Sequence, residues 1–254
     1  MSLSAAERAQ LGALSSGRIA LGWPAIHFLA ALYTRFGTTS AREVTDVIAD
    51  STASLTAGYF SGFIAGTDST GFNTALADPN LDNPQTGHFF SFVKWALNGI
   101  SEFEAAAALG HEFVTDGGPL AQLDQLIAGA PDAAAFRDLI TQLPLDPRGN
   151  LDYGSLDSEF SEHGWSDRIV ETEVEVRQVP GLPLTTRDEY YTGNSLPDLR
   201  CTVAGFHFGR LVRSGLFGSA VDAAGWLVRN VLDGPCRISF GGDVAILLGS
   251  GRRR

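Results

Sequence analysis

The chain has few basic residues and almost no lysine. Among its 254 residues, 18 are basic and 29 are acidic, so the formal net charge is −11, and Lys94 is the one lysine. Nucleic-acid binding without sequence preference depends on lysine and arginine side chains that neutralise phosphates. The composition therefore excludes nucleic acid as a general partner.

Cysteine and long apolar runs are also scarce. Cys201 and Cys236 are too far apart for a metal knuckle, so we expect two buried thiols, with a disulfide as the alternative. No run of 18 apolar residues occurs, which argues against a transmembrane helix. The first residues lack the basic and apolar regions of a secretory signal. We expect a protein that is cytoplasmic at synthesis, with export by a non-classical secretion system as the alternative.

What the chain does have is apolar content and a concentration of negative charge. Hydrophobic residues make up 44% and charged residues 19%, which is enough apolar surface for a real core. Residues 1–147 carry 15 acidic and 6 basic residues, whereas residues 148–254 carry 14 acidic and 12 basic ones. A dense acidic stretch runs from Asp152 to Glu175. We interpret it as a solvated face, because its spacing matches no calcium-binding loop.

Serine followed three residues later by glutamate is a helix-start signal, because the two side chains satisfy backbone donors that the first helical turn leaves free. The signal occurs at Ser4, Ser40 and Ser101. Proline at helix starts and glycine at helix ends add further boundaries. The expected helices span residues 5–14, 24–36, 41–65, 87–97, 102–115, 119–129, 131–143 and 220–232.

Three glycines, Gly58, Gly62 and Gly66, recur at a spacing of four at the end of the expected helix 41–65. Small residues at this spacing let a second helix approach closely, either in a soluble core or in a lipid bilayer. The apolar run around them is too short to span a bilayer, so we favour a core crossing. A membrane-inserting hairpin made with residues 19–33 is the minority alternative.

Beyond residue 147 the pattern changes from helix to strand. Residues 148–167 are rich in aspartate, glycine and serine and are expected to form an acidic linker or loop. Residues 168–179 alternate between apolar and charged side chains, as in a half-buried strand, and residues 200–208 are expected to form another strand. Residues 238–248 have the pattern of a hairpin that turns at two glycines.

The predicted fold class is therefore α+β. We expect a helical bundle as the domain at residues 1–147, followed by the linker at 148–167. A small antiparallel sheet with one helix is expected to form the β-rich part at 168–254.

Several well-known catalytic motifs are missing. The sequence has no nucleophile elbow, no glycine-rich phosphate loop, no HExxH zinc motif and no dinucleotide fingerprint. These absences remove the commonest hydrolases, nucleotide-binding enzymes and metalloproteases. The remaining candidates for chemistry are two histidines in neighbouring expected helices, His88 and His111.

His88 lies about eleven residues before the turn between these helices, and His111 lies about eleven residues after it. In an antiparallel pair of helices the two imidazoles come level at one end, near the carboxylates that flank them in sequence. We predict His88, His111 and Glu112 as catalytic residues, and Asp82, His88, His111 and Asp116 as ligands of a divalent metal. The alternative is that both histidines serve packing and helix-end electrostatics.

A helix pair with His-Phe on the first helix and His-Glu about twenty-three residues later resembles small helical domains of bacterial secreted effectors and polymorphic toxins. His88-Phe89 and His111-Glu112 reproduce that spacing over about 35 residues of the chain. The polar residues that precede the first histidine in those domains are matched only in part, for example by Asp82. The resemblance implies an effector-type role and assigns no reaction.

Three functional hypotheses follow. The leading one is a bacterial effector-like or toxin-like protein whose helical part carries the His/Glu/Asp site, with a hydrolytic reaction or a bound divalent metal. The first alternative is a non-enzymatic structural or interaction protein that docks a protein partner in a larger assembly through its acidic face or a sheet edge. The second alternative is membrane insertion through the glycine-patterned helix. The oligomeric state is left open.

Overall fold

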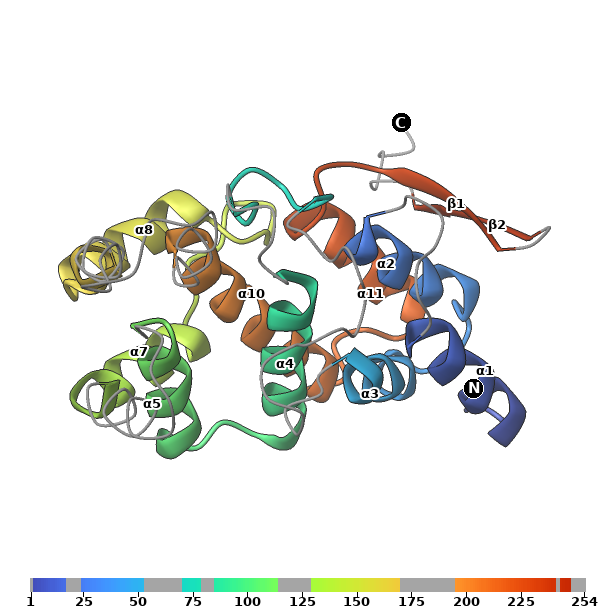
Figure 1. Cartoon of the computed structure of the whole chain (residues 1–254), viewed down its shortest axis with the longest axis horizontal. Helices are drawn as coiled ribbons and strands as arrows, with labels where there is room; N and C mark the ends of the chain where they lie inside the picture. Colours follow the sequence, from blue (N-terminus) through green and yellow to red (C-terminus); the bar gives the residue numbers. More distant parts are fainter. Residues whose placement is uncertain are drawn as a thin grey trace, which may run out of the picture. The chain divides into compact units, whose positions relative to one another are not determined.

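A computed structural model of the chain describes residues 2–16, 24–52, 70–78, 85–113, 129–169, 195–240 and 243–247, and helices dominate these residues (Figure 1). The helices are α1 (Ala5–Ser16), α2 (Ala25–Arg35), α3 (Ala41–Thr52), α4 (Gln85–Asn98), α5 (Glu102–His111), the 3-10 turn η1 (Ala130–Asp132), α7 (Ala133–Thr141), α8 (Tyr153–Glu162), α10 (Leu196–Arg213) and α11 (Ala220–Asn230). The strands are β1 (Cys236–Phe240) and β2 (Asp243–Leu247). The chain forms two compact units: unit 1 comprises residues 1–99 and 204–254, and unit 2 comprises residues 100–203.

The predicted α+β class is wrong, because the described part of the chain is all-α apart from one two-stranded hairpin. Residues 200–208, expected to form a strand, lie in the middle of α10. Valine, threonine and aromatic residues favour strands only weakly, and packing decides their conformation. Here a Cβ atom on Gly205 would come within 2.6 Å of the Phe89 carbonyl oxygen. The missing side chain lets α10 lie directly on α4.

Reciprocal side-chain caps begin several helices. At the start of α1, the Glu7 N–H donates to Ser4 Oγ at 3.3 Å and the Ser4 N–H donates to Glu7 Oε2 at 2.8 Å, which confirms the predicted cap. Two further helices, α10 and α11, begin with the same arrangement built on aspartate: Ser195 with Asp198, and Ser219 with Asp222. Because aspartate takes the place of glutamate in both, the serine–glutamate pattern did not predict these two caps.

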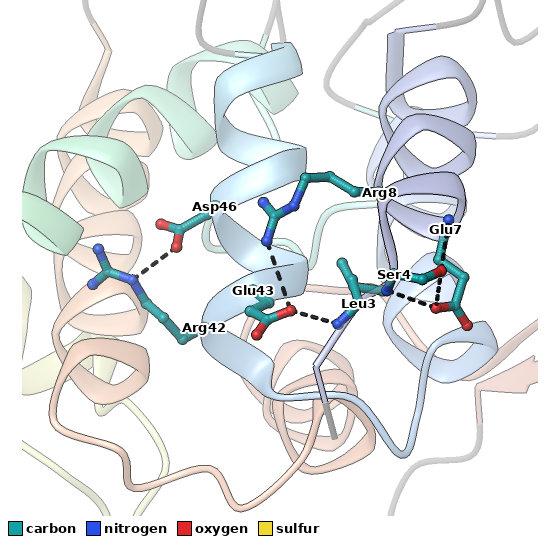
Figure 2. A network of polar contacts seen from close by, with 7 residues as sticks. All are labelled: Leu3, Ser4, Glu7, Arg8, Arg42, Glu43 and Asp46. Carbon is teal, nitrogen blue, oxygen red and sulfur yellow. Dashed lines mark hydrogen bonds and ion pairs between the residues drawn. The ribbon is translucent and has the colours of Figure 1, made fainter.

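The glutamate expected to cap α3 is used differently. Figure 2 shows the carboxylate of Glu43 facing α1, where Oε2 accepts the N–H of Leu3 at 2.6 Å and lies 3.6 Å from Arg8 Nη2. The hydrogen bond from Leu3 is the main reason that the pKa of Glu43 lies below its usual value. The residue therefore holds the start of α1 against α3.

The expected acidic linker at 148–167 contains a helix, α8. Asp152 caps it by accepting the Ser155 N–H at 3.2 Å. Aspartate and serine, whose abundance here indicated a loop, are equally suited to the start of a helix. Of the strand expected at 168–179, residues 168 and 169 are helical and the rest lies outside the described residues.

The predicted C-terminal hairpin is confirmed. Strands β1 and β2 pair antiparallel, with Cys236 opposite Leu247 and Phe240 opposite Asp243. The two turn glycines lie outside the described residues. The hairpin packs on α2, within unit 1 (Figure 1).

Each unit has its own aromatic core. In unit 1, Phe208 of α10 lies at the centre, with ring centroids 5.9 Å from Tyr33, 6.0 Å from Phe89 and 5.2 Å from Trp226. In unit 2, the buried ring of Trp165 lies between Phe136 and Phe160. Large apolar side chains that are fully buried account for the stability of both cores.

No helix within the described ranges is long and apolar enough to cross a membrane. Gly58, Gly62 and Gly66, on which the membrane-insertion alternative depends, lie outside those ranges. The core crossing predicted for this glycine pattern stays a prediction.

Candidate functional site

His88, the first of the predicted catalytic residues, lies in the first turn of α4 in unit 1. Its side chain is 4% exposed, and its ring centroid is 4.9 Å from that of Phe92, four residues later, at an interplanar angle of 68°. The imidazole therefore contacts the edge or face of an aromatic ring inside the core. This environment suits a packed histidine.

Glu112 follows the end of α5 in unit 2. It is fully buried, and its Oε1 accepts a hydrogen bond from the Thr202 hydroxyl. A buried carboxyl is costly unless hydrogen bonds compensate it, so this bond across ninety positions of the chain is part of how unit 2 tolerates the group. His111 is the last residue of α5; its side chain lies outside the description.

Of the four predicted metal ligands, only His88 has a side chain that the structure describes. Asp82 and Asp116 lie outside the described residues, while His88 belongs to unit 1 and His111 to unit 2. Among the side chains that the structure describes, no group of three histidine, cysteine, aspartate or glutamate residues could hold a metal ion. The catalytic and metal roles of these residues stay predictions.

A histidine outside the predicted site makes a defined polar contact. His27 Nε2, at the start of α2, lies 2.7 Å from Asp233 Oδ1 and 3.0 Å from the carbonyl oxygen of Gly71. Because both neighbours are acceptors, this nitrogen carries a proton and donates. Gly71 has φ +82°, and a Cβ atom there would come within 2.5 Å of Pro24. His27 is therefore a buried histidine whose ring nitrogen is held by two hydrogen-bond acceptors.

The C-terminal end of α10 is fixed by a backbone cap. Gly215, at φ +72°, donates its N–H to the Val212 carbonyl at 3.1 Å, and Leu216 donates its N–H to the Leu211 carbonyl at 3.2 Å. This pair of bonds is the Schellman motif that ends many helices. In that motif the residue after the glycine often packs back onto the helix, but here this residue, Leu216, is 67% exposed. Among the described residues, no other large apolar side chain is as exposed.

A cavity of about 320 Å³ opens beside this cap, lined by Arg210, Leu211, Arg213 and Ser214. Among the described residues, two arginines line this cavity. Partial burial lowers the pKa of the Arg210 guanidinium, which nevertheless stays charged at neutral pH. The Arg213 guanidinium lies against Gly99, where a Cβ atom would come within 2.8 Å of its Nη1. Arg210 and Arg213 thus both contribute to a concave surface.

His207 lies one turn before Arg210 on the same helix. Burial, with a smaller contribution from the charge of Arg210, lowers the pKa of His207 to about 4. The imidazole is therefore neutral at pH 7. Its ring centroid is 5.8 Å from that of Trp226, and within the described residues its Nδ1 has no hydrogen-bond partner. Neutral His207 leaves the two arginines as the positive charges of this end of α10.

Sequence reasoning missed Arg210, Arg213 and Leu216, because residues 200–208 were predicted to form a strand that ended just before them. The sequence does contain a signal for the end of this helix. Basic residues followed by glycine are typical of a helix end, and Arg210, Arg213 and Gly215 have that spacing. Recognising the helix would have placed the exposed leucine directly after its cap.

Comparison of the chain with protein-family models, with curated proteins and with solved structures gives no match.

Proposed function

We propose that this chain is a non-enzymatic interaction protein that docks a protein partner in a larger assembly, and that it docks through the surface at the end of α10. This surface, made by Arg210, Arg213, Ser214 and Leu216, is called the α10 end surface below. One observation carries the proposal: Leu216 is 67% exposed next to a cavity that has two arginines in its wall.

A single exposed leucine is ordinary on a protein surface. Leu216 differs because its backbone is tied to Leu211, a residue of the cavity wall, so little main-chain freedom is lost when a partner covers it. Arginine is enriched in protein interfaces, where it forms charge-assisted hydrogen bonds. A fixed apolar side chain beside two arginines therefore favours the interpretation that this surface docks a partner over the interpretation that it is an ordinary solvent-exposed turn.

Burial of two of the three predicted catalytic residues, His88 and Glu112, supports docking over catalysis. A substrate would have to reach His88 and Glu112, whose side chains are 4% and 0% exposed. The effector-like role that the resemblance implies is compatible with this proposal, because an effector can act by binding a target protein.

The proposal is tested by comparing two leucine variants in affinity purification from the organism that makes the protein. Leu216→Ser changes the proposed surface, and Leu145→Ser changes another exposed leucine, in unit 2. We expect a protein that co-purifies with the wild type and with Leu145→Ser and is lost with Leu216→Ser. A partner that all three retain, or the absence of any partner, would contradict the proposal.

The catalytic alternative has its own experiment. Divalent metal is titrated into the purified wild type and into His111→Ala. Saturable binding that disappears in the variant would favour the His/Glu/Asp hypothesis over docking. Equal binding to both proteins would remove the metal form of that hypothesis.

A further inference from the structure

We infer that α1 is a strap: a helix that detaches from α3 on its own, while the rest of unit 1 stays folded, and thereby uncovers apolar surface on α3. The inference does not depend on the α10 end surface. It follows from the small buried part of α1, from the contacts of Glu43, and from a glycine in α1 that the described packing does not require.

Little of α1 is buried. Of its residues 5–15, only Leu11 and Ser15 are buried, and residues 5–10 are all exposed. Leu11 is therefore the one large apolar side chain that these residues bury fully. A helix of twelve residues is marginal in water unless tertiary packing supports it. The stability of α1 thus depends on a small area of contact.

The contact with α3 follows one stripe of that helix. Glu43, Val47 and Ser51 recur every four residues of α3, so they share one face. A Cβ atom on Gly12 of α1 would lie 3.8 Å from Val47 Cγ1 and 3.9 Å from Ser51 Oγ. Val47 is 7% exposed while α1 is in place. Detachment of α1 would therefore uncover this valine.

Glu43 fastens the start of α1 at one end of the stripe (Figure 2). Its Oε2 accepts the N–H of Leu3 and lies 3.6 Å from Arg8 Nη2. The side chains of Arg8 and Glu43 are 49% and 24% exposed, so water competes for this ion pair and its contribution is small. Helix α3 also packs on α4 and α11, and it keeps these contacts when α1 leaves.

Gly12 weakens the strap. It lies inside α1, where glycine makes a helix less stable than alanine does. The described atoms within 4 Å of a Cβ atom at this position are both at ordinary van der Waals distance, so alanine fits. Gly209 of α10 differs, because a Cβ atom there would come within 2.6 Å of α4. Glycine in α1 therefore favours opening, whereas glycine in α10 permits close packing.

Hydrogen exchange of the full chain at increasing urea concentration tests the inference. We expect the amides of α1 to exchange through a local opening that depends little on urea. The amides of α3 should exchange more slowly and with a larger urea dependence, because their opening exposes more surface. If α1 and α3 exchange at the same rate with the same urea dependence, α1 opens only by global unfolding and the inference is overturned.

Variants should shift the opening in both directions. Gly12→Ala should slow exchange of the α1 amides about fivefold, whereas Leu11→Ala should speed it at least about tenfold and Glu43→Gln about threefold. Asp46→Asn is the matched control on α3, because this carboxylate binds Arg42 of the same helix (Figure 2) and should leave α1 exchange unchanged. A folded Gly12→Ala variant whose α1 exchanges as fast as in the wild type would overturn the inference.

Thiol labelling tests whether the opening uncovers α3. Val47→Cys places a thiol beneath α1, and the reaction of the two native cysteines is measured in the wild type and subtracted. Labelling of the new thiol should become about threefold faster when Glu43→Gln is added and about fivefold slower when Gly12→Ala is added. Labelling that responds to neither change would show that α1 unwinds in place, which contradicts a strap.

Discussion

The two units fill their interiors with different kinds of contact. In unit 1, α10 lies so close to α4 that a Cβ atom on Gly209 would come within 2.6 Å of both Ala96 Cβ and the Val93 carbonyl oxygen. Aromatic rings surround this crossing, and His207 is held beside them in its neutral form. The core around this crossing therefore depends on volume and on neutral side chains.

In unit 2, defined polar pairs join residues that are far apart in the sequence. Arg200 makes two hydrogen bonds of 2.7 Å to the carboxylate of Asp157, and Arg168 lies 3.0 Å from Asp132 and 3.8 Å from the ring centroid of Phe113. The buried carboxyl of Glu112 adds its bond to Thr202. From this contrast we expect that added side-chain volume lowers the free energy of unfolding most in unit 1, whereas the loss of single polar groups lowers it in unit 2.

The largest effect is expected from a methyl group at the close crossing of unit 1. Gly209→Ala places an atom against the Val93 carbonyl oxygen, and we expect a loss of about 3 kcal/mol or more in the free energy of unfolding. Urea unfolding combined with hydrogen exchange of α4 amides measures it.

Gly225→Ala is the matched control. Gly225 lies on α11, where the one described neighbour that a new Cβ atom would meet is the end of the Arg229 side chain, at 3.4 Å. Because alanine favours helices over glycine, this variant should be neutral or stabilised by up to about 1 kcal/mol. Equal losses in the two variants would contradict the close crossing.

The next effect depends on pH. His207 has a pKa of about 4 in the folded chain against the ordinary 6.5. Between these values the unfolded chain takes up a proton that the folded chain does not, so stability falls as the pH drops from about 7 to 4, by up to about 3 kcal/mol. The loss levels off below about pH 4, where the folded form also titrates.

Unfolding of wild type and His207→Gln across this pH range checks the effect. The variant should lose less stability on acidification than the wild type. His163→Gln, at an exposed histidine of unit 2, should follow the wild-type curve. Parallel curves for wild type and His207→Gln would show that burial of this imidazole contributes nothing to the loss of stability at low pH.

The helices of unit 1 were largely predictable because local signals agree with packing there. Ser4 and Glu7 cap α1 as expected, Pro24 precedes α2, and α11 occupies the expected range to within two residues. The error at α10 has a physical cause. Its valine, threonine and aromatic residues have strand propensity, but the segment packs closely on α4 at Gly205 as a helix. That contact joins segments more than one hundred positions apart.

The candidate site was less predictable for a related reason. Residue type and spacing singled out His88 and Glu112, but burial, which sequence does not give, places both inside cores. The residues of the α10 end surface carry no motif. Leu216 is notable only because the cap at Gly215 leaves it exposed, and this depends on backbone geometry at the end of a helix that had to be recognised first.

A smaller effect is expected at the polar pair Glu112 and Thr202 of unit 2. Thr202→Val removes the hydroxyl donor with little change of shape, and we expect a cost of about 1–2 kcal/mol. Glu112→Gln should cost less, because the amide oxygen still accepts the bond. A double-mutant cycle between Glu112→Ala and Thr202→Val should give a coupling of about 1 kcal/mol or more, and additive losses would show that the bond is unimportant.

The smallest effect concerns two ion pairs, one in each unit. The pair Arg200–Asp157 has side chains that are 15% and 36% exposed, whereas the helical pair Arg42–Asp46 has side chains that are 38% and 36% exposed. Asp157→Asn breaks a two-pronged contact around a largely buried guanidinium and should cost about 1 kcal/mol, against about 0.3 kcal/mol for Asp46→Asn.

Chemical unfolding in low and in high salt separates these two cases. Screening should remove most of the Asp46→Asn effect and leave a larger share of the Asp157→Asn effect, since water and ions reach the Arg200 guanidinium less freely. Arg200→Lys should behave like Asp157→Asn, because lysine cannot make both hydrogen bonds to the carboxylate. If high salt removes the same share of both effects, the Arg200–Asp157 pair stabilises unit 2 no more than an exposed ion pair stabilises unit 1. The two units then differ only in the close helix crossing of unit 1.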